Sequence, residues 1–400
     1  APARTARRAS CRSGGGRGEP PARGLVHLKP RVKPVRERTV AAGVPALEDL
    51  TGQSLARYTT LRLGGPADRL VVARTDDEVI EAVRAATGPL LVLAGGSNLV
   101  VGDHGFPGTV LLLRTTGMAA VRSGGGSESD ESLIWTVAAG ETWDDVCAEA
   151  VAAGYAGIEC LSGIPGSAGA TPVQNVRAYG PEVAETVVAG RAYDRERDAL
   201  VRLTAAECGF DYRTSVFKHH DRYVVLSVDF ALTAGGRSAP IRYAELARTL
   251  GVAVGDRVPL ADARAAVLTL RAGKGMVLDP ADHDTWSAGS FFTNPILDAA
   301  AFAALRSAAA EFGEPPSWPG RSGTVKTSAA WLIERAGFSR GYQGAHPTVA
   351  VSTRHTLALT HRGGGRTEHL LALAREIRTG VATRFGVTLA PEPVLVGCAL

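Results

Sequence analysis

Hydrophobic residues begin to follow a regular pattern near Ala46, and strand-like and helix-like segments then alternate to about residue 234. Val79 and Val83 recur at helical spacing behind Thr75, which predicts a capped helix that ends near Gly88. After this helix come apolar runs of strand length, each bounded by glycines or polar turn residues. The predicted strands lie in 89–96, 109–113, 133–140, 182–194, 199–203 and 222–232.

Capping signals place two further elements in this half of the chain. Thr142 precedes apolar residues at helical spacing and Gly154 follows them, which predicts a second helix between these positions. Thr204 and Glu207 have the spacing of a capping box and predict one helical turn. The polar, glycine-rich stretch 122–132 predicts a surface connection, either a hairpin or a link between subdomains.

After about residue 235 the pattern becomes mainly helical. Helices are predicted over 241–250, 259–272, 298–311, 327–336 and 366–385, with short strands near 349–351 and 355–360. The run at 394–397 predicts a final strand that returns to an earlier sheet. Without an internal repeat or a heptad run, these elements predict an α+β protein of two or three units.

The positive charge of the chain is confined to its beginning. The formal net charge is +4, yet residues 1–45 alone hold eleven Arg and Lys against two Glu. The remainder is therefore acidic, which argues against a nucleic-acid binder that uses its folded surface. The first 45 residues resemble an organellar transit peptide in composition. We interpret them as a disordered tail, because they cannot bury enough apolar surface to offset their ordering entropy.

Several classes of protein are excluded by what the sequence lacks. No apolar stretch is long enough for a membrane span, and the first residues lack the apolar core of a secretory signal. The signatures of Rossmann dinucleotide binding, P-loops, zinc proteases and α/β-hydrolases are absent, and no histidines are paired at metal-ligand spacing. The five cysteines are scattered, which favours reduced thiols of a cytoplasmic protein over a disulfide framework or a zinc site.

Two glycine-rich loops are the clearest candidates for chemistry. LVLAGGSNLVVGD carries Gly95, Gly96, Ser97 and Asn98 after a buried strand. In LSGIPGSAGATPVQN, glycine recurs at every third position from 163 to 169. Such loops are usually tight turns, but they also allow backbone N–H groups to converge on an anion. Two of them in one domain favour a pyrophosphate-binding cradle.

Seven segments together carry a family resemblance. They are YTTLRLGGPADRL, LAGGSNLVVGD, GIPGSAGATPVQN, DYRTSVFK, AGSFFTNP, VKTSAAWLIERAG and PEPVLVG, in this order. Over residues 46–398 the chain resembles the UDP-N-acetylenolpyruvoylglucosamine reductases, flavin enzymes of bacterial cell-wall precursor synthesis. The resemblance implies an FAD-binding PCMH-type domain, like that of vanillyl-alcohol oxidases, with two α+β subdomains. An α+β substrate-binding domain is expected to follow it.

The resemblance also implies the domain boundaries and the flavin-binding residues. We expect the FAD domain over 46–234, divided near 117–132 and joined by strand 390–400, and the substrate domain over 235–389. Relatives that link FAD covalently often carry a histidine beside the first glycine pair; Ser97 and Asn98 stand there, so non-covalent FAD is expected. The implied FAD contacts are Thr60, Gly95, Gly96, Ser97, Asn98, Leu99, Gly163, Ile164, Pro165, Gly166, Gly169 and Ala170.

The reaction that the resemblance implies makes specific demands on side chains. Hydride enters an enolpyruvyl ether, and negative charge then builds on the α carbon and the carboxylate. This enolate needs a fixed cation, a hydrogen-bond donor and a proton. The family pattern assigns these roles to Arg213, Glu392 and Ser290. By residue type alone, each would be an ordinary surface, turn or loop residue, so the assignment depends on the surrounding motif.

Further positions match the substrate site of the family. These are Tyr179, Tyr243, Lys274, Asn294 and Gln343, with Arg271 beside Lys274 as a second cation for the NADPH or UDP phosphates. Two departures from the family pattern stand out. Arg177 occupies a position where glycine is usual, which would strain the backbone if φ were positive there. Ala345 and His346 also follow Gln343 and Gly344 where smaller residues are typical.

The resulting expectation is an NADPH-dependent, FAD-containing reductase of a UDP-linked enolpyruvyl sugar. It should be cytoplasmic and monomeric, with a small-molecule substrate, no metal, and neither nucleic acid nor membrane as a partner. Two alternatives stay open at this point. One is an FAD-dependent alcohol oxidase or dehydrogenase with the same flavin domain, and the other is a non-catalytic polyanion-binding protein that uses the basic tail.

Overall fold

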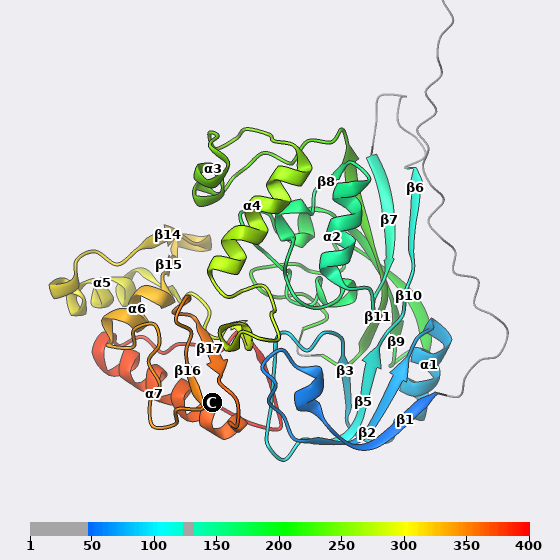
Figure 1. Cartoon of the computed structure of the whole chain (residues 1–400), viewed down its shortest axis with the longest axis horizontal. Coiled ribbons are helices and arrows are strands. Elements are labelled where there is room, and N and C mark those ends of the chain that lie inside the picture. The colour runs from blue at the N-terminus through cyan, green and yellow to red at the C-terminus, as the bar shows by residue number, and fades with distance from the viewer. Residues whose placement is uncertain (1–46, 123–131, 219) are drawn as a thin grey trace, which may run out of the picture. The chain divides into compact units, whose positions relative to one another are not determined.

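The computed structural model describes residues 47–122, 132–218 and 220–400 (Figure 1). The predicted disordered tail lies outside these residues, as does most of the connection predicted over 122–132. The strands on either side of that connection, β6 (Met118–Arg122) and β7 (Ser132–Ala138), pair antiparallel, as they would in a hairpin.

The first sheet holds four strands in the order β1-β2-β5-β3. They are β1 (Glu48–Ser54), β2 (Pro66–Ala73), β5 (Phe106–Leu113) and β3 (Leu90–Leu93). β5 pairs parallel with both β2 and β3, so the connection from β2 to β3 crosses over through α1 (Asp76–Ala85). The hydroxyl of Thr75 accepts a hydrogen bond from the Glu78 N–H, which confirms the predicted cap.

The second sheet is antiparallel and continues the chain from β6 and β7. Its other members are β9 (Val187–Asp194), β10 (Ala199–Thr204), β11 (Tyr223–Ala234) and the short β8 (Tyr155–Ala156). The helix predicted after Thr142 is α2 (Trp143–Ala152). The Trp143 ring is fully buried and packs against Phe230 of β11, so α2 covers this sheet.

The remainder of the chain contributes to two further hydrophobic cores. α3 (Ala244–Leu250) and α4 (Leu260–Gly273) pack in a small core that includes Cys160 of the first half. α5 (Ala299–Ala308), α6 (Ala329–Arg335) and α7 (Thr367–Phe385) form a larger core, which also takes in Leu61, Leu63 and Val100. Two small sheets have the orders β12-β17-β16 and β13-β15-β14. Their strands are β12 (Ser287–Ser290), β13 (Ile296–Leu297), β14 (Ser317–Pro319), β15 (Val325–Thr327), β16 (Val349–Val351) and β17 (Ala358–His361).

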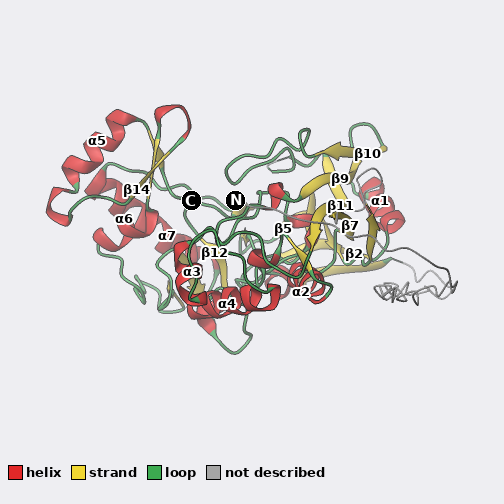
Figure 2. Ribbon diagram, turned by 90° about the horizontal axis from the view of Figure 1, so that it is seen from above, coloured by secondary structure: helices red, strands yellow, loops and turns green. Residues whose placement is uncertain are grey.

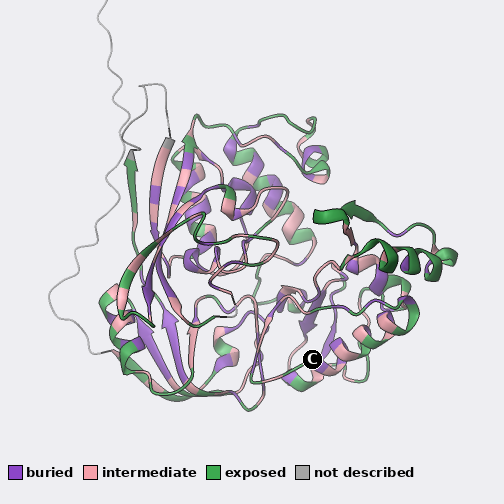
Figure 3. Cartoon of the chain, turned by 180° about the vertical axis from the view of Figure 1, so that it is seen from behind, coloured by how far each residue is buried: buried purple, intermediate pink, exposed green. Residues whose placement is uncertain are grey.

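The figures show how these groups are arranged. The larger strands gather on one side of the described chain, and α5, α6 and α7 lie on the other (Figure 2). The inner strands β2, β5, β9 and β11 are largely buried, whereas the edge strands β1 and β6 are mostly exposed (Figure 3). Among the described residues, every helix is too short or too polar to reach across a bilayer.

The final strand returns to the first half of the chain, as predicted. β18 (Val394–Val396) pairs parallel with β4 (Leu99–Val101), which follows the first glycine loop directly. Just before β18, the Glu392 N–H donates to the Phe291 carbonyl at 2.9 Å. One short segment therefore joins the first glycine loop to the strand that carries Ser290.

The differences from the sequence prediction are local. The strand predicted over 182–194 begins only at Val187, because Glu182 and Glu185 form a capping box around a 3-10 turn. Thr204 and Glu207 make the predicted reciprocal hydrogen bonds, but around a turn rather than a helix. The sequence prediction missed β12 to β15, since strands of two to four residues are too short to show alternation. It also assigned no strand at β1, β2, β4, β6 and β8, although β1 and β2 have seven and eight residues.

Candidate active site

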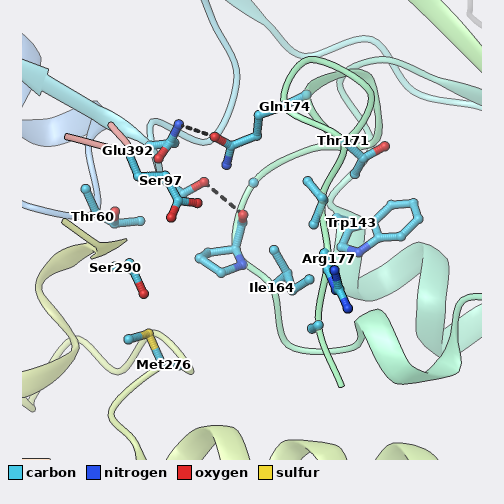
Figure 4. Close-up of a pocket in the computed structure, with 18 of the residues that line it drawn as sticks. Thr60, Ser97, Trp143, Ile164, Thr171, Gln174, Arg177, Met276, Ser290 and Glu392 are labelled. Carbon is cyan, nitrogen blue, oxygen red and sulfur yellow. Dashed lines mark hydrogen bonds between the residues drawn. The ribbon is translucent and has the colours of Figure 1, made fainter. Parts of the chain in front are cut away.

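A cavity of about 720 Å³ opens between the two glycine loops and the second half of the chain. Most of the residues expected at the flavin and substrate sites line it. Figure 4 shows Ser290 and Met276 on one side of it and the loop of Ile164 on the other. Residues from distant parts of the sequence thus meet at one place.

The first glycine loop lies in direct contact with neighbouring backbone. A Cβ atom on Gly95 would come within 2.6 Å of the Gly166 Cα, and one on Gly96 would overlap the Tyr58 carbonyl. Gly96 also has φ of +59°, and its carbonyl accepts a hydrogen bond from the Thr60 N–H at 3.1 Å. Both positions therefore require glycine, for close approach at Gly95 and additionally for conformation at Gly96.

Side chains hold the two loops together. The Ser97 hydroxyl donates to the Pro165 carbonyl at 2.8 Å, and the Asn98 amide donates to the Gln174 side chain at 2.8 Å (Figure 4). Asp144 of α2 accepts from the Gly163 N–H at 2.6 Å. The loops are therefore fixed before any ligand binds.

The paired loops fit a dinucleotide diphosphate. The Ser167 hydroxyl, between Gly166 and Ala168, is buried and has no hydrogen-bond partner among the described residues. It lines the cavity, where an anionic oxygen could accept its proton. At Gly166, φ of +124° and a Cβ contact of 3.1 Å with Ser97 Oγ also favour glycine. An FAD diphosphate lying across these loops would meet this hydroxyl and nearby N–H donors.

Arg213 and Glu392 form an ion pair in the lining of the cavity. The Arg213 Nε lies 3.3 Å from Glu392 Oε1, and their side chains are 24% and 10% exposed. Arg213 itself has φ of +56°, an uncommon conformation for a residue with a side chain. Its carbonyl accepts from Lys218 Nζ at 2.9 Å, which holds the turn in place.

The environment of Glu392 shifts the pKa of its carboxyl upward. Burial raises the pKa of this carboxyl, and the nearby Arg213 and Lys218 oppose the shift without cancelling it. Ser290 ends β12, one residue before the Phe291 carbonyl that Glu392 N–H contacts. All three residues assigned to the chemistry line the same cavity.

Four of the five expected substrate residues also line this cavity: Tyr179, Tyr243, Lys274 and Asn294. The rings of Tyr179 and Tyr243 meet edge to face at 5.5 Å, and Lys274 Nζ lies 5.6 Å from the Tyr179 ring centre. Burial raises the pKa of Tyr179 to about 12, so its hydroxyl stays a hydrogen-bond donor. Lys274 is paired with Glu245 at 2.5 Å.

The structure does not place Gln343 at the site. Its side chain is exposed in the turn between α6 and β16, outside the cavity lining. Its assignment to the substrate site stays a prediction, because a short motif fixes residue order but not the path of a long turn. Gly163 and Gly169 belong to the second glycine loop but do not line the cavity. Cβ atoms added to them would contact Leu268 and Ala139, respectively.

Several cavity residues were absent from the sequence prediction: Met276, Trp318, Lys326 and His355. His355 is the most unusual, because burial together with Lys274 and Arg271 lowers its pKa to about 4. Its Nδ1 accepts from the Leu357 N–H at 3.2 Å, so a neutral His355 carries its proton on Nε2. In the sequence, His355 belongs to the predicted short strand at 355–360. That pattern indicates secondary structure but not a position in a binding site.

The departure at Arg177 brings no backbone strain. Its φ is not among the positive values of the described residues, although Asn175 and Tyr179 on either side have φ of +46° and +49°. Arg177 instead forms an isolated bridge with Glu182. Glycine is therefore not required at this position for conformational reasons. The described residues contain no cluster of three or more His, Cys, Asp or Glu side chains suited to a metal ion.

Comparison with known proteins gives consistent matches along the chain. Residues 67–202 match the family described as an FAD binding domain. Residues 279–396 match the C-terminal domain of UDP-N-acetylenolpyruvoylglucosamine reductase. A protein of that name from Salinispora arenicola is 61% identical over 350 residues, covering 86% of this chain and 95% of its own. A protein of the same name from Streptomyces coelicolor is 58% identical, and the match covers 88% of this chain and 92% of that protein.

A solved structure has the same fold. The crystal structure of UDP-N-acetylenolpyruvylglucosamine reductase from Thermus caldophilus aligns with a TM-score of 0.58 at 23% identity. The alignment covers 88% of this chain and 98% of that one. Together with the FAD-binding match, it confirms the α+β fold class with a flavin-binding domain.

Proposed function

Because the chain belongs to the UDP-N-acetylenolpyruvoylglucosamine reductase family, we propose how its own residues carry out that reaction. The chain is an FAD-dependent oxidoreductase of peptidoglycan precursor synthesis. It reduces UDP-N-acetyl-3-O-(1-carboxyvinyl)-glucosamine to UDP-N-acetylmuramate, with NADPH as the hydride donor. The relatives' shared name favours this reaction over alcohol oxidation or polyanion binding.

The two glycine loops hold the flavin cofactor. FAD, when bound, carries the hydride from NADPH to the enolpyruvyl ether. Backbone N–H groups of 95–99 and of Ile164, Gly166 and Ser167, with the Ser167 hydroxyl, would bind its diphosphate. Thr60, Leu99 and Ala170 line the same space. Ser97 donates to Pro165 where covalent relatives often carry histidine, so the cofactor is held without a covalent bond.

Arg213 binds the substrate carboxylate. Its planar fork of donors can make two parallel hydrogen bonds to a carboxylate. As hydride enters the carbon β to the carboxylate, negative charge spreads onto the carboxylate oxygens and the guanidinium holds them more strongly. The ion pair with Glu392 keeps the guanidinium oriented before the substrate arrives.

Glu392 stabilises the enolate oxygen by donating a proton or sharing a hydrogen bond. This role needs a protonated carboxyl, and burial of Glu392 shifts its pKa upward in the required direction. Pro391 and Pro393 and the backbone bond to Phe291 limit the movement of this segment.

Ser290 donates the proton that completes the reaction at the α carbon. A hydroxyl is a weak acid, but an enolate carbon is basic enough to take a proton from one that is well placed. Ser290 is half-buried at the end of β12, on the side of the cavity opposite Ile164 (Figure 4). Its hydroxyl makes no side-chain hydrogen bond within the described residues that would withhold the proton.

The observation that carries this assignment is the convergence of Arg213, Ser290 and Glu392 on one cavity beside the two glycine loops. The test separates the two halves of the reaction by stopped-flow absorbance of the bound flavin. Ser290→Ala should leave bleaching by NADPH at the wild-type rate and slow re-oxidation by the enolpyruvyl sugar by roughly a hundredfold or more. Equal loss in both halves would contradict the role of Ser290.

We also propose the domain limits and the setting of the enzyme. The FAD domain extends over 46–234, divided near 117–132 and joined by strand 390–400, and the substrate domain covers 235–389. The family matches at 67–202 and 279–396 lie on opposite sides of the proposed boundary at 234, and the β18–β4 pairing supports the return of strand 390–400. The enzyme acts in the cytoplasm as a monomer, without nucleic-acid or membrane partners. Light scattering after size exclusion would test the monomer.

A further inference from the structure

Arg177 places a cation at the rim of the cavity that the proposed reaction does not use. It lines the cavity, and its side chain is 42% exposed. The guanidinium is anchored on one side, where Nη1 lies 3.1 Å from Glu182 Oε1. Glu182 is itself fixed, because its other carboxylate oxygen accepts from the Asn175 amide at 2.9 Å. The isolated bridge between Arg177 and Glu182 fixes the backbone as well.

Most of the donors of Arg177 remain available. A guanidinium carries five N–H groups, and the contact with Glu182 occupies one nitrogen. The ion pair between Arg177 and Glu182 is half-exposed, and such pairs contribute little to folding stability. Stabilisation of the fold is therefore not a sufficient reason for an arginine at this position. The remaining N–H groups can therefore be used by a ligand.

Cations outnumber carboxylates on the cavity wall around Arg177. Among the described residues that line the cavity, the cationic side chains are Arg177, Arg213, Arg271, Lys274 and Lys326. Glu392 is the single carboxylate in that lining. Lys326 lies 5.3 Å from the ring centre of Tyr212, beside Arg213. Burial lowers the pKa of Lys326; repulsion from Arg177 and Arg213 adds to this shift, and Glu182, the partner of Arg177, opposes it. An anion bound among these side chains would relieve the repulsion.

We propose that Arg177 is a phosphate-binding residue of the cavity, and that it binds the diphosphate of a nucleotide ligand. This inference rests on the proposed function for the identity of the ligands. The enolpyruvyl substrate carries two separated anions, a carboxylate for Arg213 and a diphosphate. NADPH carries a diphosphate as well, so both nucleotides offer the same chemistry. Planar guanidinium donors suit phosphate oxygens better than a lysine ammonium does.

The experiment compares Arg177→Ala and Arg177→Lys holoenzymes with the wild type. Arg202→Ala is the matched control, because Arg202 pairs with Asp229 at 2.6 Å, is 57% exposed and lies outside the cavity lining. Calorimetry with UDP alone measures the phosphate contact without turnover. Flavin bleaching gives the Kd of NADPH, and steady-state assays give KM and kcat for the enolpyruvyl sugar.

Removing Arg177 should weaken a diphosphate ligand three- to tenfold, roughly the value of a charge-assisted contact in a half-exposed setting. The kcat of the saturated enzyme should not change, Arg177→Lys should recover part of the loss, and 0.5 M salt should reduce the difference. Weaker UDP binding and a raised sugar KM would identify the UDP-sugar as the ligand. A raised Kd of NADPH alone would identify NADPH.

Unchanged affinities for UDP and NADPH in Arg177→Ala would overturn the proposal, and so would equal losses in Arg202→Ala. Failure of the proposed function is a different result. It would appear in the wild type, as flavin that NADPH does not bleach or that the enolpyruvyl sugar does not re-oxidise.

Discussion

Gly95→Ala tests whether contact between the two glycine loops creates the flavin site. The new Cβ would lie 2.6 Å from Gly166 Cα and 3.1 Å from Gly166 N. Non-bonded heavy atoms prefer about 3.5–4.0 Å, so the loops would have to separate by roughly 1 Å. Gly95 is not among the positive-φ residues, and the substitution therefore changes packing without adding backbone strain.

The expected cost follows from the packing. Overpacking a close contact costs about 1–3 kcal/mol, and the contacted atoms here are backbone, which cannot rotate away as a side chain would. If FAD binds only when the loops are together, about 2 kcal/mol corresponds to a roughly thirtyfold weaker Kd for FAD. The Kd is measured by titrating the deflavinated chain and following flavin fluorescence.

Gly273→Ala provides the matched control. Gly273 is the last residue of α4, also lies outside the positive-φ set, and has no atom within 4 Å of a built Cβ. Its substitution should leave FAD affinity unchanged and stabilise the helix by a few tenths of a kcal/mol. Wild-type FAD affinity in Gly95→Ala, with circular dichroism showing a native fold, would refute the reasoning that loop contact forms the site.

Three further predictions concern protonation and loop anchoring. Burial raises the pKa of Glu392, so the free energy of unfolding of the wild type, relative to that of Glu392→Gln, should fall as pH rises through that raised pKa. Urea titrations at a series of pH values measure both free energies. A difference between the two proteins that does not change with pH would contradict this. Burial alone would raise the pKa of Asp144, but hydrogen bonds from Arg264 and the second glycine loop lower it. Asp144→Asn should therefore be less stable than wild type at neutral pH and equal to it only below the lowered pKa, with urea midpoints as the measurement. Burial raises the pKa of Cys160 to about 12 and raises that of Cys147 well above its ordinary value, so iodoacetamide at pH 8 should label neither in native protein, as peptide mass mapping would show.

The sequence predicted the long elements well because each carries its own periodicity. The helices expected over 259–272 and 366–385 are α4 and α7 nearly to the residue. Caps such as Thr75 were also local signals, readable without knowledge of neighbours. Short strands such as β12 were missed, because their formation depends on partners far along the chain.

The site was predictable only in part for the same reason. Motifs located Arg213, Ser290 and Glu392, but the 3.3 Å contact between Arg213 and Glu392 depends on tertiary packing. Gln343 belongs to a matching motif yet is exposed outside the cavity. His355 is unremarkable in sequence, and its low pKa arises from burial beside Lys274 and Arg271. Motifs therefore located candidates, while packing decided which of them share a cavity.

The pairing of β18 with β4 also has a consequence for the order of folding. The two segments are remote in sequence: Cys398 Sγ donates to the Val100 carbonyl across 298 positions, close to the β18–β4 contact. Closing such a long loop carries an entropy cost that local helices and hairpins do not face, so this contact should form late. The hydrophobic cores on either side can assemble first. In refolding experiments, the far-ultraviolet circular dichroism signal should recover before the chain gains the ability to quench flavin fluorescence. Flavin added at the start of refolding should bind only after β18 has paired with β4.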